Sequence, residues 1–510
     1  MNILLHLALA SVAFFIVGDA APASGASSAA PTVTIDSGVV VGTTTQLAGA
    51  TVAVDKYLGI PFAASPTRFA PAVKPTPWKS PYQATKYGPA CIQQFNYPEL
   101  SRNATMAWFN TPPPTAGESE DCLNLNVYVP ATPGKNKTVM AWIYGGSLQF
   151  GSNSALLTYT HQVFGFPNSP ELPLAKRNLG FLDQRFALNW IQRNIAAFGG
   201  DPKKVTIFGE SAGAASVDAL VTSIPKNPPF RAAIMESGQN SFYINPTNVP
   251  TSWLTLAAVL NCTQTHPHSN LTCLRAANAS IIKSTIEHLA LPFRPVSDNV
   301  TLLRYPEVAR LNKSIADVPI LTGTNANEGT LFVVGQSDSA AYLASVLGNQ
   351  TALIQSILAA YPEAPAAQLA AIVTDFTFAC PAGILANDSH AAGYPTWRYY
   401  FNATFANTQI FQGAGVYHSS EIPLVWGTYP RVNATAEEKA LSQYMQTAWA
   451  TFAQNPHAGP GWHGVPTVAD LGTAGVLKTP INAGVVDKNC HFFRQYYNMF
   501  GSAVAGAAGG

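Results

Sequence analysis

A serine lies at the centre of the pentapeptide Gly209-Glu210-Ser211-Ala212-Gly213, which directly follows the apolar run Val205–Phe208. This G-x-S-x-G pattern is typical of a tight, strained turn between a strand and a helix, where side chains in place of the glycines would collide with neighbours. The turn exposes the hydroxyl at a helix N-terminus, where backbone N–H groups stabilise developing negative charge. The pattern predicts that Ser211 is a nucleophile.

A serine that attacks a carbonyl also needs hydrogen-bond donors for the oxyanion. Gly145-Gly146-Ser147 is a second glycine turn, and it follows the apolar run Val139–Tyr144, which we expect to form the strand beside Val205–Phe208. The loop after that neighbouring strand commonly supplies N–H donors, together with the residue after the nucleophile. The predicted donors are therefore Gly146, Ser147 and Ala212, and the less favoured alternative is that the glycines form an ordinary turn.

An acid and a histidine should follow the serine in that order along the chain. Glu328 lies in a loop after the apolar run Val318–Thr322, where its carboxylate could orient an imidazole and stabilise its charged form. His418 lies beyond the apolar run Trp397–Phe401, where the base is expected. Order alone also admits other histidines beyond Glu328, and His390, His463 and His491 are rivals to His418.

These residues require a scaffold that gathers the ends of several strands. The apolar runs named above alternate with helical spacing, as in Asp183–Phe198, where Leu188, Ile191 and Ile195 share one face. This alternation favours an α/β fold, a mostly parallel central sheet with helices on both faces. We expect one catalytic domain over residues 32–500, opened by a strand at Thr32–Val41.

Composition narrows the classes of partner. Hydrophobic residues make up 47% and charged residues 11% of the 510-residue chain, and the net charge is +1. No cluster of lysine and arginine is present, so nucleic acid and anionic membranes are poor candidate partners. After the N-terminal segment, no stretch reaches the roughly 18 uninterrupted apolar residues of a spanning helix, so integral membrane association is not expected.

Several features predict export. Residues 1–20 carry the apolar run Ile3–Val17 followed by small residues, which predicts a signal peptide cut near Ala20 or Ala23. A linker should follow at 21–31, and a disordered tail at 501–510. Six cysteines allow fifteen pairings of three disulfides. Eleven N-glycosylation sequons are present, at Asn103, Asn136, Asn261, Asn270, Asn278, Asn299, Asn312, Asn349, Asn387, Asn402 and Asn433.

Motifs along most of the predicted mature chain resemble the type-B carboxylesterase/lipase family of cholinesterase-like α/β-hydrolases. They begin at Tyr57–Phe62 and Glu120–Val127 and continue through Asn194 to the serine, acid and histidine motifs and Cys490, while Phe164–Glu171 looks most like the secreted fungal branch. The resemblance implies a Ser211/Glu328/His418 triad that hydrolyses carboxylic esters through an acyl-enzyme. It also implies the disulfides Cys91–Cys122, Cys262–Cys273 and Cys380–Cys490.

The chain departs from this family in two places. The family usually has glycine where Ser147 stands, and serine is disfavoured there if the position needs a positive φ. The family also has about twenty further residues between stretches like Gly151–Tyr159 and Val163–Phe166, including a core strand that flanks the strand Val139–Tyr144. One core strand is therefore expected to be missing after Gly151, leaving a ladder edge unpaired at about 1–3 kcal/mol per buried group.

The leading hypothesis is a secreted carboxylesterase or lipase that needs no metal or organic cofactor; the pair His266/His268 lacks convergent acidic or thiolate ligands. Its substrate would be a small-molecule or lipid ester, and a lipid interface is a further candidate partner. The alternatives are a peptidase with the same triad, an inactive cholinesterase-like binding protein, or the defective product of a mis-spliced or mis-predicted gene. Apolar residues between Cys91 and Cys122 predict either a mobile lid or a fixed rim, namely Phe95, Tyr97, Leu100, Met106, Trp108 and Phe109.

Overall fold

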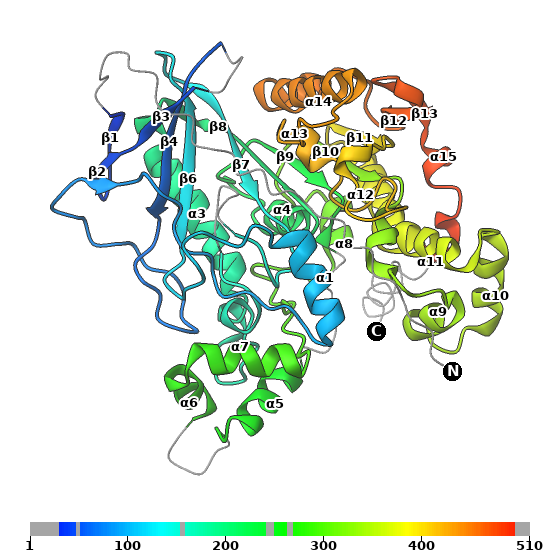
Figure 1. Ribbon diagram of the computed structural model, residues 1–510, viewed down its shortest axis with the longest axis horizontal. Coiled ribbons are helices and arrows are strands. Elements are labelled where there is room, and N and C mark those ends of the chain that lie inside the picture. Colours follow the sequence, from blue (N-terminus) through cyan, green and yellow to red (C-terminus); the bar gives the residue numbers. More distant parts are fainter. Residues whose placement is uncertain (1–29, 47–50, 153–158, 241–248, 263–268, 495–510) are drawn as a thin grey trace, which may run out of the picture.

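The computed structural model describes residues 30–46, 51–152, 159–240, 249–262 and 269–494 (Figure 1). The predicted signal peptide, the linker up to residue 29, the tail 501–510 and the pair His266/His268 lie outside these residues.

A seven-stranded sheet forms the centre of the fold, and its order is β13-β12-β11-β10-β9-β8-β7. All neighbouring pairs from β7 to β12 are parallel, whereas β13 is antiparallel to β12. The strands β9 and β10 are buried along their whole length, as expected for a parallel sheet covered by helices. The predicted α/β-hydrolase fold is therefore confirmed, with strands at β7 Lys137–Ile143, β8 Gly200–Glu210, β9 Ala232–Glu236, β10 Ile320–Asn325, β11 Thr396–Phe401, β12 Thr467–Leu471 and β13 Thr479–Asn482.

Helices that connect the parallel strands pack against this sheet. The helix α4 packs on β8 and β9, α12 packs on β10 and β11, and α14 packs on β7 and β8. The predicted helix Asp183–Phe198 divides into the α-helix α3 and a short 3-10 turn, Ile195–Phe198. The helices around the sheet are α2 Gln162–Gly165, α3 Leu179–Asn194, α4 Ala212–Ser223, α8 Pro306–Leu311, α12 Cys380–Ala391, α13 Ile422–Val425, α14 Ala436–Gln454 and α15 Ala483–Val486.

The N-terminal strands form two small sheets outside the central one. The segment predicted as a single strand, Thr32–Val41, is instead a hairpin, because the chain reverses at Asp36-Ser37 and Gly38 takes a φ of 132°. A three-stranded antiparallel sheet, β3-β4-β6, lies beside the central sheet (Figure 1). The bounds are β1 Thr32–Ile35, β2 Gly38–Val41, β3 Thr43–Thr45, β4 Val54–Pro61, β5 Tyr82–Gln83 and β6 Asn124–Pro130.

In the part of the chain that the structure describes, the central sheet ends at β7, and residues 153–158, where the missing strand is expected, lie outside it. Among the described residues β7 pairs only with β8, and β6 pairs only with β4. No ladder joins β6 to β7, so the two sheets face each other across unpaired edges.

Two helical groups extend from the core, α5 to α7 at the bottom of Figure 1 and α9 to α11 at its right. One group surrounds its own apolar cluster, which includes Trp253, Leu274 and Ile286. The second encloses Ile357, Ile372 and Phe493. Their bounds are α5 Thr251–Val259, α6 Asn270–Ala276 and α7 Ala279–His288 for the first, and α9 Ser339–Leu347, α10 Thr351–Ala360 and α11 Pro365–Val373 for the second.

Three disulfides join the pairs that the resemblance implied, Cys91–Cys122, Cys262–Cys273 and Cys380–Cys490. The continuous helical stretch Pro365–Ala391 is long and apolar enough to cross a membrane, but 67% of its most apolar window is buried inside the protein. It carries Cys380 and packs on the sheet through α12, so it is a core helix of the fold.

Candidate active site

The sequence around Ser211 forms the predicted turn between a strand and a helix. The strand β8 ends at Glu210, α4 begins at Ala212, and Ser211 between them adopts φ 57° and ψ −123°. A non-glycine residue in this region is strained by about 1–3 kcal/mol, so surrounding contacts must hold it. The Ser211 N–H donates to the Glu236 carbonyl at 2.8 Å, and the Ser211 carbonyl accepts from Ala215 at 2.9 Å.

The two glycines of the pentapeptide are required by close backbone approach. A Cβ atom on Gly209 would lie 2.4 Å from the Ile143 carbonyl oxygen, and one on Gly213 would lie 2.0 Å from the same oxygen. Both distances are far below a normal contact, so β7 can lie against the turn only because these positions lack side chains.

The loop after β7 reaches the serine. A Cβ atom on Gly145 would lie 3.0 Å from the Ser211 Cβ, which places this loop beside the nucleophile position. Gly146 and Ser147 have φ values of 98° and 57°, and Ala212 is buried at the start of α4. The predicted oxyanion donors Gly146, Ser147 and Ala212 thus come from two loops that flank Ser211. Ser147 does adopt the positive φ for which glycine is the usual residue.

His418 and Glu328 are in direct contact. Glu328 follows β10 and begins a 3-10 helix, Glu328–Val333, whereas His418 lies in the loop between β11 and α13. His418 Nδ1 lies 2.6 Å from Glu328 Oε2, and both side chains are buried. The other candidate bases, His390, His463 and His491, are all exposed, and none of them contacts Glu328 in the described part of the chain.

The second imidazole nitrogen faces the residue before the serine. His418 Nε2 lies 3.1 Å from Glu210 Oε1, and the Ser419 hydroxyl donates to the same oxygen at 2.6 Å. Within the described residues, Ser211 and His418 form no hydrogen bond. The structure therefore brings Glu328 and His418 together directly, and it places Ser211 next to them through Glu210.

Both carboxylates act on the titration of His418. Burial alone lowers the pKa of this imidazole, but the negative charges of Glu210 and Glu328 and the hydrogen bond that His418 donates to Glu328 outweigh burial, so the net pKa is raised. Burial raises the pKa of Glu210, although the neighbouring His418 and the Ser419 hydroxyl oppose that shift. In the resting arrangement, a protonated imidazole can bridge the two carboxylates.

Two further buried glutamates lie near this group. Burial raises the pKa of Glu236 to about 8, although the Trp449 indole donates to its Oε1 at 2.6 Å. Burial and the charges of Glu210 and Glu328 raise the pKa of Glu421 well above its usual range. Burial therefore disfavours the charged form of both groups, which limits the negative charge near His418.

Two aromatic rings contact the imidazole and exclude water from it. The rings of Phe378 and Phe332 lie 4.7 Å and 5.1 Å from that of His418. Phe378 is buried in the π-helical segment Thr374–Ala379, whereas Phe332 is partly exposed at the surface. Charge interactions at His418 are stronger in this setting because the surroundings are poorly polar.

Four functional contacts were not singled out from the sequence. Glu210 was read only as the variable residue of the pentapeptide, and Ser419 only as part of the histidine segment. Ser237 donates to Glu328 Oε1 at 2.5 Å, and the Asn325 backbone N–H donates to the same oxygen at 2.7 Å. Asn325 lies at the end of β10, and Ser237 follows β9, so their positions after apolar runs were the available signal.

This arrangement offers a hydroxyl at a helix N-terminus, an imidazole oriented by a carboxylate, and backbone donors beside the hydroxyl. Together these are the parts that acyl transfer requires. No group of three or more His, Cys, Asp or Glu side chains that could hold a metal occurs among the residues that the structure describes.

Comparison with known proteins places this geometry in context. Residues 29–467 match the carboxylesterase family. The chain is 30% identical to a mouse cholinesterase, with 91% of this chain and 86% of the relative covered. It is 34% identical to para-nitrobenzyl esterase of Bacillus subtilis (strain 168), over 83% of this chain and 89% of the relative. It is 31% identical to rat carboxylesterase 1C, with 87% of this chain and 88% of the relative covered.

Proposed function

The chain belongs to the carboxylesterase family and is a carboxylic-ester hydrolase, and we propose that it acts through Ser211, His418 and Glu328. The observation that carries this proposal is the buried 2.6 Å contact between Glu328 and His418 beside the strained turn at Ser211. Glu328 accepts from Nδ1–H and so leaves Nε2 to act as the base.

In the proposed reaction, the protonated His418 that contacts Glu210 first releases its Nε2 proton to solvent and becomes neutral. The neutral nitrogen then accepts the Ser211 proton as the hydroxyl attacks the ester carbonyl. Backbone N–H groups of Gly146, Ser147 and Ala212 stabilise the oxyanion, the alcohol leaves, and water releases the acid from the acyl-enzyme. The substrates are small-molecule esters.

A fluorophosphonate probe tests this assignment, because it labels only an activated serine. We expect labelling and hydrolysis of p-nitrophenyl butyrate in the unmodified chain and the loss of both in Ser211→Ala. Ser345→Ala, which changes an exposed serine on α9, is the matched control and should keep both. A folded chain that neither labels nor hydrolyses would instead support the inactive, binding-protein alternative.

We also propose that the protein is exported and N-glycosylated. Nine of the predicted sequon asparagines are exposed, and three disulfides are formed, as suits an oxidising compartment. Asn270 is an exception, because its side chain is buried and therefore not accessible to glycosylation. Enzymatic removal of N-glycans should lower the mass of the secreted protein, and peptide mapping should find Asn270 unmodified.

Lipase activity is the finer alternative that one element favours. The helix α1, Glu99–Phe109, lies within the Cys91–Cys122 loop and buries none of its residues, and Leu100 is 87% exposed. The Trp108 ring lies 5.5 Å from that of Phe411, and the Phe109 ring lies 5.6 Å from that of Phe150, so the helix contacts the rest of the molecule through these rings without burying any residue. A lipase would show a sharp rise in tributyrin hydrolysis above the solubility limit, whereas an esterase would saturate below it.

A further inference from the structure

Ser419 directly follows the proposed base, and its backbone conformation is one that favours glycine. Its φ is 75°, in the left-handed region where a residue with a side chain is strained. Two other positions of the same loop with positive φ, Gly413 and Gly415, are glycines. A serine at the third position indicates that its side chain contributes something that glycine cannot.

The Ser419 hydroxyl binds the carboxylate that the proposed base also contacts. It donates to Glu210 Oε1 at 2.6 Å, and His418 Nε2 lies 3.1 Å from the same oxygen. Within the described residues, the Ser419 side chain forms no other hydrogen bond. Ser419 can therefore keep its hydrogen bond to Glu210 while His418 Nε2 turns from this oxygen toward Ser211.

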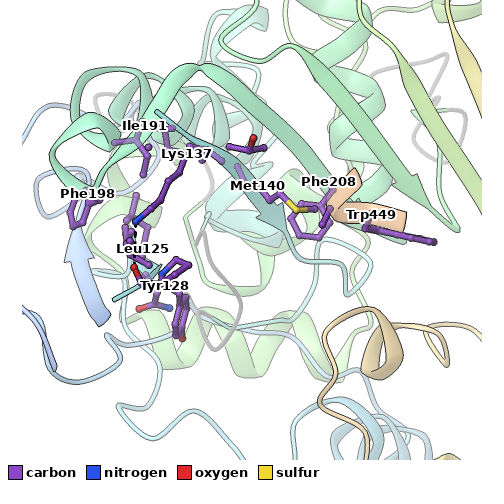
Figure 2. A pocket seen from close by; sticks show the side chains of 18 of the residues that line it. Leu125, Tyr128, Lys137, Met140, Ile191, Phe198, Phe208 and Trp449 are labelled. Carbon is purple, nitrogen blue, oxygen red and sulfur yellow. Dashed lines mark hydrogen bonds between the residues drawn. The ribbon is translucent and has the colours of Figure 1, made fainter. Parts of the chain in front are cut away.

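Glu210 receives little stabilisation from water, because it is only 5% exposed. A cavity of about 760 Å³ lies beside β7, and Figure 2 shows Phe208 and Trp449 at one end of it. Among the described residues, neither Glu210 nor Ser419 lines this cavity. A buried carboxylate keeps its charge where donors or positive charges stabilise it, and in the described part of the chain Ser419 and His418 do so.

The other titratable groups that interact with Glu210 are all acids. Burial and then the charge of Glu328 raise the pKa of Glu210. Burial, and to a smaller extent the charge of Glu210, raises the pKa of the three remaining groups, which are Glu236, Glu421 and Tyr399. None of these acids favours a charged Glu210. Once His418 is neutral, the Ser419 hydroxyl is therefore the group among the described residues that still stabilises this charge.

We propose that Ser419 is a positioning residue of the hydrolysis reaction, whose hydroxyl holds the Glu210 carboxylate, in its charged form, beside the imidazole of His418. This inference rests on the proposed function of Ser211 and His418. When His418 takes the Ser211 proton it becomes an imidazolium, and a negative Glu210 stabilises that cation. The same charge keeps a proton on the resting imidazole in acid. Ser419 thereby raises turnover above the acid limb of the pH profile and restricts turnover below it.

The test compares the pH dependence of p-nitrophenyl butyrate hydrolysis in the unmodified chain, Ser419→Ala and Ser419→Gly. Both variants lack the hydroxyl, so we expect the acid limb to move to lower pH by about 0.5–1 unit and the plateau kcat to fall about threefold to tenfold. Only Ser419→Gly relieves the strained φ, so its thermal midpoint should be the higher of the two. The two acid limbs should nevertheless coincide. Acid limbs that follow the thermal midpoints, or that do not move, would overturn the proposal.

A double variant tests whether Ser419 acts through Glu210. Adding Ser419→Ala to Glu210→Gln should cause no further shift of the acid limb, and an additive shift contradicts the proposal. Ser420→Ala is the matched control, because it changes the next serine of the same loop, whose hydroxyl lies 3.5 Å from the Asn325 amide and forms no hydrogen bond with Glu210 among the described residues. It should keep the acid limb of the unmodified chain.

Nuclear magnetic resonance of isotopically labelled histidine gives a readout that does not depend on activity. The His418 signal is identified by its loss in His418→Gln, and we expect it to titrate at lower pH in Ser419→Ala than in the unmodified chain. If the unmodified chain does not hydrolyse the ester, the proposed function fails. If it does hydrolyse the ester and His418 titrates at the same pH with and without the Ser419 hydroxyl, the proposal for Ser419 alone is wrong.

Discussion

Replacing Glu210 with glutamine should move the acid limb of the pH–activity profile to lower pH. The carboxylate lies 3.1 Å from His418 Nε2 and favours the protonated imidazole, which cannot act as a base. At an effective dielectric constant of about 20, two unit charges at this separation attract by about 5 kcal/mol, an upper limit of about four pKa units. Burial raises the pKa of Glu210, so the full charge is not always present, and we expect a fall of about one to three units.

The sign follows from which form of His418 is active. Its pKa is raised above 6.5 in the folded chain, so activity should appear only as the pH rises through that higher value. Without Glu210 the neutral base forms at lower pH, and activity extends downward. The raised pKa also stabilises the folded protein below about pH 6.5, and this contribution is lost as the pH rises through the folded-state pKa. Glu210→Gln should reduce that stabilisation.

The assay is the pH dependence of kcat/KM for a soluble p-nitrophenyl ester, which reports the free enzyme. Glu421→Gln is the matched control, because Glu421 is equally buried but contacts Asn325, and no hydrogen bond or ion pair joins it to His418 in the described part of the chain. Its acid limb should coincide with that of the unmodified chain. If Glu210→Gln is folded and active but its acid limb does not move, the contact between Glu210 and His418 does not control the base, and the reasoning fails.

Three further predictions concern stability. Ser147→Gly should stabilise the protein by about 1 kcal/mol in guanidinium unfolding, because Ser147 holds a φ of 57°, and an equal or lower midpoint would contradict this. Replacing both Cys380 and Cys490 with serine opens a connection across 110 residues and should lower the free energy of unfolding by about 4–5 kcal/mol, measured against the intact chain without reductant. Arg310→Ala should lower the free energy of unfolding by about 3–5 kcal/mol, because it removes the ion-pair partner of the buried Asp218 carboxylate. A double change to Arg310→Met and Asp218→Leu should cost less than the single one, and a cycle of unfolding measurements checks that order.

Short-range patterns were sufficient for the parts of the site that depend on local geometry. The glycines around Ser211 and the apolar run before it identified the turn, because only residues without side chains allow β7 to approach there. Continuous apolar runs likewise located β7, β8, β10 and β11, since strands buried on both faces must be apolar along their length. The interpretation of Thr32–Val41 as one strand was wrong because a two-residue reversal leaves little trace in an apolar pattern.

Contacts between distant segments were decided only when the chain folded. Several histidines satisfied the required order, and burial against Glu328, 90 residues away, distinguishes His418 from the exposed His390, His463 and His491. The contact between Glu210 and His418, which are 208 residues apart, could likewise not be predicted from spacing. The sequon at Asn270 is a local pattern, but only the packing of the chain buries its side chain. Spacing along the chain carries information about neighbours within a turn or a strand, whereas the distance between two loops depends on how every intervening strand and helix packs.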